Sequence, residues 1–151
     1  MQKLLLLVLI GLFGSSAVMA MGHMDEDQQA VWSTVAASWE DEASKTGEWP
    51  GEYLHEDAKA WGAEWPAPRD AASIESWARF GDENSTTEKY ELFPMTVTVS
   101  GDTAVAHYGV VQITKSDDET EREMSGLVET LVRTDDGWKF IALTGFEMGD
   151  D

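Results

Sequence analysis

The sequence predicts one α+β domain, in which N-terminal helices pack on an antiparallel β-sheet. In the first half of the chain the apolar residues recur at helical spacing, whereas from residue 89 onward they alternate with a period of two. The alternating segments are separated by Gly-Asp and Asp-Gly pairs, which favour tight hairpin turns. Helices followed by a long meander are typical of a layered α+β arrangement.

The first twenty residues are typical of a secretory signal peptide. Lys3 gives a positive start, residues 4–13 form an apolar run, and small residues precede a cleavage site after Ala20. The run is too short to span a bilayer comfortably, and an uncleaved anchor is the alternative. We therefore expect a domain of residues 21–151 that is periplasmic or secreted and free of the membrane after cleavage.

The composition limits the partners and the chemistry. The chain has a formal net charge of −19, whereas nucleic acids and anionic membranes bind clustered Lys and Arg. It has no cysteine, which excludes disulfides, thiolate metal sites and cysteine nucleophiles. The consecutive residues His55, Glu56 and Asp57 point in different directions, so we predict no metal site there. No phosphate loop or dinucleotide fingerprint occurs, and we expect no cofactor.

The first element of the domain is predicted to be a helix over residues 28–45. Asp25 or Asp27 caps its start, and Gly47 ends it. Five apolar residues share the face expected to pack on the sheet: Val31, Trp32, Val35, Ala36 and Trp39.

Shorter elements are expected next. Residues 49–54 form a turn or a short second helix, residues 58–61 a weak strand, and residues 65–68 a rigid proline-containing loop. A further helix starts at a cap formed by Asp70 or Ser73 and ends at a polar break over residues 81–87. Its inward residues are predicted to be Ile74, Trp77, Ala78 and Phe80, and we expect Trp77 in the core together with Trp32 and Trp39.

The meander consists of two predicted hairpins. Residues 89–99 and 103–114 form the first, with Gly101 and Asp102 in its turn. This turn places five pairs on one face of the sheet: Val99 with Ala104, Val97 with Ala106, Met95 with Tyr108, Phe93 with Val110, and Glu91 with Gln112. His107 falls on the other, outer face.

Residues 119–133 and 138–147 form the second hairpin, across Asp135-Asp136-Gly137. The residues expected on the face of Glu129 are Trp138, Phe140, Ala142, Thr144 and Phe146. Both faces of this hairpin are largely apolar, so we expect a second copy of the chain, as a homodimer, to cover the outer one. The alternative is an outer face that is half exposed.

Several local motifs, in this order, resemble the NTF2-like superfamily, and its SnoaL-like and DUF4440-type groups in particular. They are Tyr53-Leu54-His55-Glu56-Asp57, Ile74-Glu75-Ser76-Trp77, Ser100-Gly101-Asp102-Thr103-Ala104-Val105 and Asp136-Gly137-Trp138-Lys139-Phe140. The resemblance implies a cone, in which a curved sheet wraps around the helices and leaves a pocket at the open end. Members bind small, mostly apolar molecules there, and some are isomerases, cyclases, hydrolases or dehydratases. Fold alone does not select among these activities.

The catalytic pattern of a ketosteroid-isomerase-like member is incomplete in this chain. The base of such an enzyme aligns near Gly62, where no acid stands, and Glu64 lies two residues away. The remaining catalytic candidates are Glu129, Tyr108, Glu91 and His55. The ligand-binding candidates are Tyr53, Trp61, Trp65, Tyr108, Gln112, Glu129 and Thr144. A Glu in an apolar cavity has a raised pKa and can act as acid or base. A structural Glu129 would instead pair with Arg133 or Lys139, or be solvated at a sheet edge.

Three functions follow from these patterns. The leading interpretation is an exported domain that binds a small, largely apolar molecule. The first alternative is an isomerase, cyclase or hydrolase of the same fold, and the second is a dimerisation or scaffold module.

Overall fold

The computed structural model describes residues 22–63, 65–117 and 119–149. The predicted signal peptide and Glu64 lie outside these residues. The described part contains two helices and six strands: α1 (Glu26–Ser44), β1 (Leu54–Gly62), β2 (Arg69–Asp70), α2 (Ala71–Asn84), β3 (Thr86–Ser100), β4 (Thr103–Ser116), β5 (Glu119–Thr134) and β6 (Gly137–Glu147). None of the described helices is both long and apolar enough to cross a membrane. The predicted α+β class is confirmed.

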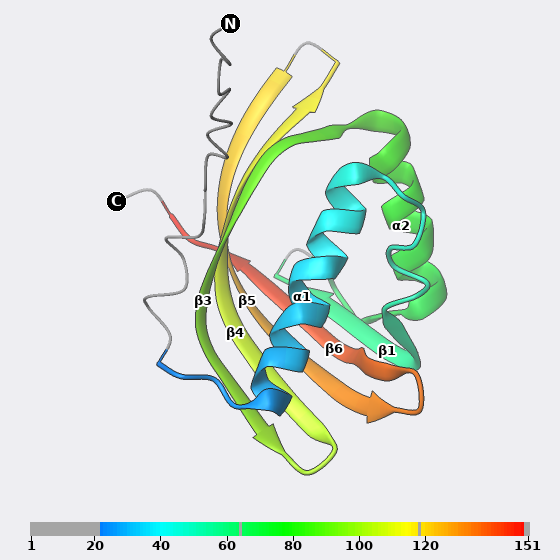
Figure 1. Cartoon of the computed structure of the whole chain (residues 1–151). Coiled ribbons are helices and arrows are strands. Elements are labelled where there is room, and N and C mark those ends of the chain that lie inside the picture. Colours follow the sequence, from blue (N-terminus) through cyan, green and yellow to red (C-terminus); the bar gives the residue numbers. More distant parts are fainter. Residues whose placement is uncertain (1–21, 64, 118, 150–151) are drawn as a thin grey trace, which may run out of the picture.

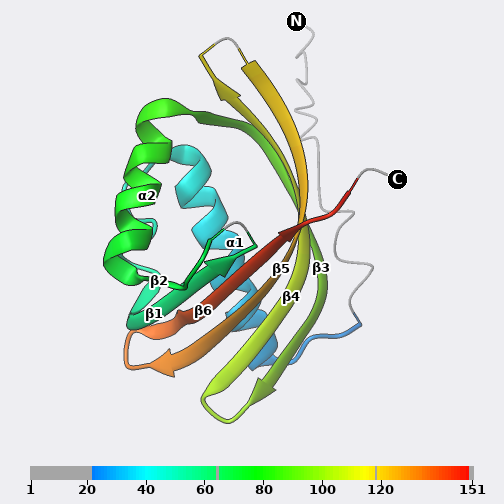
Figure 2. The ribbon, with the colours of Figure 1, turned by 180° about the vertical axis from the view of Figure 1, so that it is seen from behind.

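The sheet is mixed rather than wholly antiparallel. Its strand order is β2-β1-β6-β5-β4-β3, and β1 runs parallel to β6, whereas the other neighbours are antiparallel. The parallel pair arises because the chain leaves β1, forms α2 and the meander, and returns beside β1 with its last strand. The sheet curves around α1, and α2 lies beside β1 and β2, the two strands at one side of the sheet (Figures 1 and 2).

Helix α1 forms one side of the core. Asp25 caps it as predicted, in a capping box where Asp25 accepts from the Gln28 backbone N–H and the Gln28 side chain accepts from the Asp25 N–H. The helix ends before the predicted Gly47, because Lys45 itself adopts the left-handed conformation. Val31 and Val35 are fully buried against the sheet residues Val97, Ala104, Ala106, Tyr108, Leu131, Trp138 and Phe140, and Trp32 and Trp39 pack at the margin.

The prediction for α2 was wrong in two respects. The helix continues through Gly81 to Asn84, where a polar break was expected. Trp77 and Phe80 are 53% and 57% exposed rather than buried. Helix α2 packs at the β1–β2 end of the sheet and not over the core (Figure 2), so its aromatic residues cover each other and the Arg69 side chain instead.

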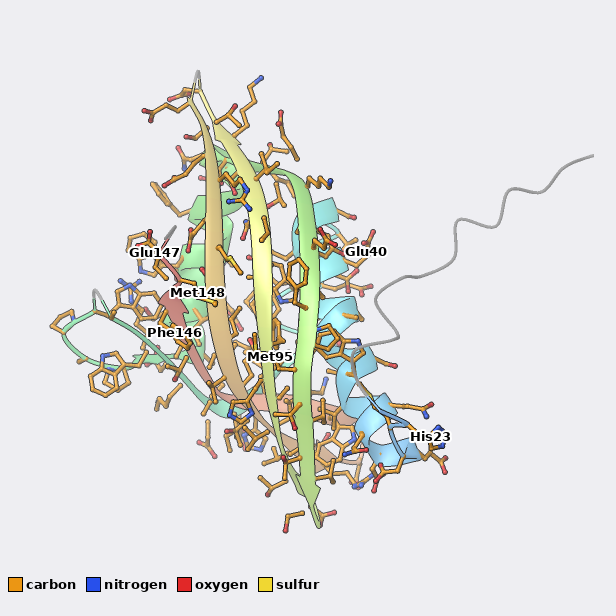
Figure 3. The ribbon with its side chains drawn as sticks, turned by 90° about the vertical axis from the view of Figure 1, so that its left-hand side faces the viewer. His23, Glu40, Met95, Phe146, Glu147 and Met148 are labelled. Carbon is orange, nitrogen blue, oxygen red and sulfur yellow. The ribbon has the colours of Figure 1, made fainter. Side chains whose placement is uncertain are left out.

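A β-bulge in β3 changes the predicted register. The pairs Val99 with Ala104 and Val97 with Ala106 are confirmed, but the register shifts between Pro94 and Thr96. The extra residue, Met95, turns the side chains from Pro94 back to Lys89 to the face opposite the predicted one, and a further irregularity lies between Thr87 and Lys89. Phe93 and Glu91 therefore face outward, and Met95 lies on the outer face of the sheet (Figure 3). Tyr90 and Leu92 take the inward positions, with Tyr90 opposite Gln112.

A second irregularity has the same effect on β6. Leu131 pairs with Phe140 but Thr130 pairs with Ala142, which leaves Ile141 as the extra residue. Trp138 and Phe140 are buried as predicted, whereas Ala142, Thr144 and Phe146 move to the outer face and are exposed. Figure 3 shows Phe146 on that face. Leu143 takes the place opposite Glu129 that was expected for Thr144.

Candidate functional site

Tyr108 and Glu129 form a buried pair on the concave face of the sheet. Ala106, two residues from Tyr108 on β4, pairs with Glu129 on β5, so both side chains point to the same side. The Tyr108 hydroxyl donates to Glu129 Oε2 at 2.9 Å, and Trp39 Nε1 donates to the Tyr108 oxygen at 2.8 Å. Tyr108 is 1% exposed and Glu129 is 4% exposed. A chain of hydrogen bonds thus runs from α1 across β4 to β5.

Burial controls the charge of this pair. It raises the pKa of Glu129 to about 8, a rise that the hydrogen bond from Tyr108 opposes and the nearby Glu42 increases. Burial also raises the pKa of Tyr108, and the charge of Glu129 adds to this effect. Glu129 is therefore mainly protonated at neutral pH and can donate as well as accept a proton.

The ion pairs expected for a structural Glu129 are not formed. Arg133 bonds to Asp27 at 2.9 Å and to Asp102 at 3.3 Å. Lys139 donates to the backbone oxygen of Glu52. Glu129 therefore has neither predicted cation beside it, and its charge depends on its burial and on Tyr108.

Glu42 is a second carboxyl group at this site, and it was not among the residues predicted from the sequence. It projects from α1 on the side of Val35 and Trp39, seven and three residues earlier, a spacing that places it on the apolar face. Burial and the negative charge of Asp82 raise the pKa of Glu42 to about 7. One feature of the sequence points to Glu42: it is an acidic residue on the helix face that Val35 and Trp39 make apolar.

Both carboxyl groups border a cavity of about 350 Å³ between α1, the start of α2 and the concave face of the sheet. Its wall is mostly apolar and contains four tryptophans. The residues that line it are Ser38, Trp39, Glu42, Trp49, Ala60, Trp61, Gly62, Trp65, Ile74, Leu127, Glu129, Leu143, Thr144 and Gly145.

A more polar cavity of about 280 Å³ shares Glu42, Trp49, Trp65 and Ile74 with the first. Gln112 borders this second cavity and donates to Thr87 at 3.2 Å and to Thr114 at 3.1 Å. The predicted ligand contact Gln112 is therefore near the apolar cavity but not in its wall.

The other predicted site residues divide into two groups. Trp61, Trp65 and Thr144 border the apolar cavity, where Trp61 Nε1 donates to the backbone oxygen of Trp65 at 2.9 Å. Thr144 is among the lining residues although its side chain is exposed and lies on the outer side of the strand.

Glu91, Tyr53 and His55 lie elsewhere. Glu91 is exposed on the outer face. Tyr53 donates to the Asp41 carboxylate. His55 Nδ1 accepts from the backbone N–H of Asp57 at 3.1 Å. These three residues are not brought together with Glu129 and Tyr108.

His107 lies on the outer face, as predicted, and its Nδ1 atom is buried without a hydrogen-bond partner. Among the described residues no group of three or more His, Asp or Glu side chains is placed to hold a metal ion.

Comparison with known proteins gives the fold but no close relative. No protein-family model matches the sequence, and none of the curated proteins matches it. Solved structures do match. A ketosteroid isomerase-like protein from Erwinia carotovora atroseptica superimposes with a TM-score of 0.72 at 11% identity, over 84% of this chain and 100% of that one. An NTF2-like protein with a cystatin-like fold from Novosphingobium aromaticivorans gives a TM-score of 0.64 at 20% identity, over 83% and 84% of the two chains.

The chain has the NTF2-like fold. An NTF2-like protein of unknown function from Prochlorococcus marinus agrees, with a TM-score of 0.67 at 13% identity over 85% of this chain and 97% of that one. The predicted NTF2-like resemblance is thus confirmed at the level of the fold. The finer assignment to the SnoaL-like or DUF4440-type groups stays a prediction.

Proposed function

We propose that this NTF2-like domain binds a small, largely apolar molecule in the cavity bordered by Glu129. The observation that carries the proposal is a mostly apolar cavity with a buried, hydrogen-bonded Glu129–Tyr108 pair in one wall. Ligand sites are commonly concave and apolar, with a few polar groups that fix orientation. The volume of about 350 Å³ suits a molecule of modest size.

The apolar floor of the cavity offers a direct test. Ala60 is 8% exposed and lines the cavity from β1, so an Ala60→Leu side chain would occupy space that a ligand needs. We expect this variant to bind the neutral fluorescent probe N-phenyl-1-naphthylamine about tenfold more weakly than the wild type. Fluorescence titration of both proteins measures the difference.

The matched control is Ala142→Leu, which makes the same change at an exposed position of the neighbouring strand β6. It should bind the probe like the wild type. Equal affinity in Ala60→Leu, or no binding by the wild type, would contradict the proposal.

Acid–base catalysis is the second candidate. Glu129, with a pKa of about 8, and Glu42, with a pKa of about 7, border one cavity. Such values suit groups that exchange protons near neutral pH. Glu42 lines the same cavity as Gly62 and takes the role of the base that the sequence lacks near Gly62. The structural similarity to a ketosteroid isomerase-like protein from Erwinia supports an isomerase-like reaction. In this scheme Glu42 removes a proton beside a ketone, while protonated Glu129 donates to the carbonyl oxygen.

This candidate predicts exchange of the α-hydrogens of cyclohexanone with solvent deuterium, followed by NMR. The wild type should accelerate the exchange, and Glu42→Gln should abolish the acceleration. Wild-type exchange at the rate of the buffer would dismiss catalysis of this type for that ketone class and leave the binding function in place.

Export and dimerisation complete the proposal. The leader-like residues 1–20 support export to the periplasm or the medium. The exposed side chains of Phe93, Met95 and Phe146 on the outer face support a homodimer.

A further inference from the structure

We propose that the molecule bound in this cavity is an organic ammonium ion with apolar substituents. The inference rests on the proposed function and names its ligand class. Two independent features of the cavity carry it: carboxyl groups without a cationic partner, and a wall rich in indole rings.

The first feature is the unbalanced charge. Glu42 and Glu129 both border the cavity, and no Lys, Arg or His is among its described lining residues. Lys45 and Arg69 border the adjoining polar cavity together with Glu42, but neither forms an ion pair with it in the described part of the chain, and Arg69 Nη1 is buried without a hydrogen-bond partner. Lys45 Nζ donates to the backbone oxygens of Asp82 and Ser85, at 2.6 Å each. Arg69 lies between the rings of Trp65 and Trp77. A buried carboxyl group without a paired charge keeps its proton, and a cationic ligand in the cavity would supply the charge that stabilises the carboxylate.

The second feature is aromatic. Trp39, Trp49, Trp61 and Trp65 line the same cavity. Indole faces attract cations, and cages of aromatic rings are a common way to bind quaternary ammonium groups. Trp65 already takes part in such a contact, with the Arg69 guanidinium 4.1 Å from its ring centre. The wall therefore suits a cation that is weakly hydrated and carries apolar groups.

A metal ion fits this cavity less well. Hard cations such as Ca²⁺ take six or more oxygen ligands, whereas among the described residues no cluster of three or more acidic or histidine side chains is available. An alkylammonium ion needs one or two carboxylates and contact with apolar surface, and both are present. The net charge of −19 also attracts cations in general.

The charges that face the carboxyl groups give the proposal a pH signature. Glu129 faces Tyr108 of β4 and Glu42 of α1, and Glu42 faces Asp82 of α2. Lys45 and Arg69 also border the polar cavity next to Glu42, but burial and Asp82 outweigh them and raise the pKa of Glu42 to about 7. In the empty cavity the carboxyl groups therefore hold protons near neutral pH. A bound ammonium ion favours the carboxylate and displaces a proton. Its affinity should therefore rise as the pH rises from about 6 to about 8.

The test compares two probes of the same shape. Phenyltrimethylammonium and tert-butylbenzene differ only in the atom that carries the methyl groups, nitrogen with a positive charge or neutral carbon. Each is titrated against wild-type protein by displacement of N-phenyl-1-naphthylamine. We expect the cation to bind about tenfold more tightly or better. Glu129→Gln, which keeps the shape and removes the charge, should lower this preference about tenfold while tert-butylbenzene binds as before.

The control variant is Glu91→Gln, which makes the same change in net charge on the exposed outer face. It should keep the full preference, which separates a local ion pair from the general attraction of an acidic protein. Glu42→Gln is the second variant, should Glu129→Gln fail to fold, and it should also weaken binding of the cation.

The outcomes distinguish the two proposals. Equal binding of both probes by the wild type, or an unchanged preference in Glu129→Gln, overturns the ammonium inference and leaves the apolar binding function standing. Absence of binding of either probe and of the naphthylamine overturns both.

Discussion

Between pH 5 and pH 9 the wild-type protein should lose roughly 3–5 kcal/mol of unfolding free energy that a Glu129→Gln variant retains. The folded-state pKa of Glu129 is about 8, whereas its ordinary value is 4.5. The folded protein therefore binds more protons than the unfolded chain between these two values. The stabilisation is complete below pH 4.5 and disappears as the pH rises through 8, because the folded state must then hold a buried carboxylate.

Urea denaturation at several pH values measures this effect. Glu42, whose pKa of about 7 is also raised, adds a loss of the same sign in both proteins, and the difference between the two curves gives the effect of Glu129 together with its charge coupling to Glu42. Glu91→Gln removes an exposed carboxylate and should follow the wild-type curve. Parallel curves for the wild type and Glu129→Gln would mean that Glu129 is solvated in the folded protein, and the description of the cavity would be wrong.

Phe140→Ala should lower the unfolding free energy by about 3–5 kcal/mol. Phe140 is fully buried, stands opposite Leu131 and contacts the Trp49 ring edge-on at 6.1 Å between ring centres. Removal of the ring leaves a void next to Trp49, which lines the candidate cavity. The variant should therefore also bind the naphthylamine probe differently from the wild type.

The control for this prediction is Phe93→Ala. Phe93 is 40% exposed on the outer face, so the same truncation should cost less than about 1 kcal/mol. Chemical denaturation of the two variants and the wild type at one pH gives the comparison. Equal losses in both variants would show that the core does not centre on Phe140.

The sequence predicted the elements better than it predicted the faces. Local sequence chemistry determines three features that the structure contains: the Asp25 cap, the apolar stripe through Val31 and Val35, and the Gly101-Asp102 turn. The bulges at Met95 and Ile141 arise from the packing of the curved sheet, and no local sequence pattern indicates them. Each bulge reverses the pleat. Strict alternation therefore placed Glu91 and Thr144 on the wrong side.

The site was predicted in part for the same reason. Tyr108 and Glu129 lie on strand segments where alternation holds, and the structure brings them together. Glu42 comes from a helix far away in sequence, and only the tertiary arrangement places it beside the same cavity. The exposure of Trp77 likewise depends on where α2 docks, because composition alone makes a tryptophan a core residue.

The shape of strand β3 limits how two copies of the chain could pair through the edges of their sheets. It is the last strand on its side of the sheet, and such open edges recruit strands from other chains. Pro94 has no N–H to offer, Met95 interrupts the regular pleat, and the Gln28 side chain donates to the backbone oxygen of Val97 at 2.8 Å. These three features protect the edge from strand addition. In the proposed homodimer, contact between copies would therefore be made through a face of the sheet and not by open-ended strand addition at this edge.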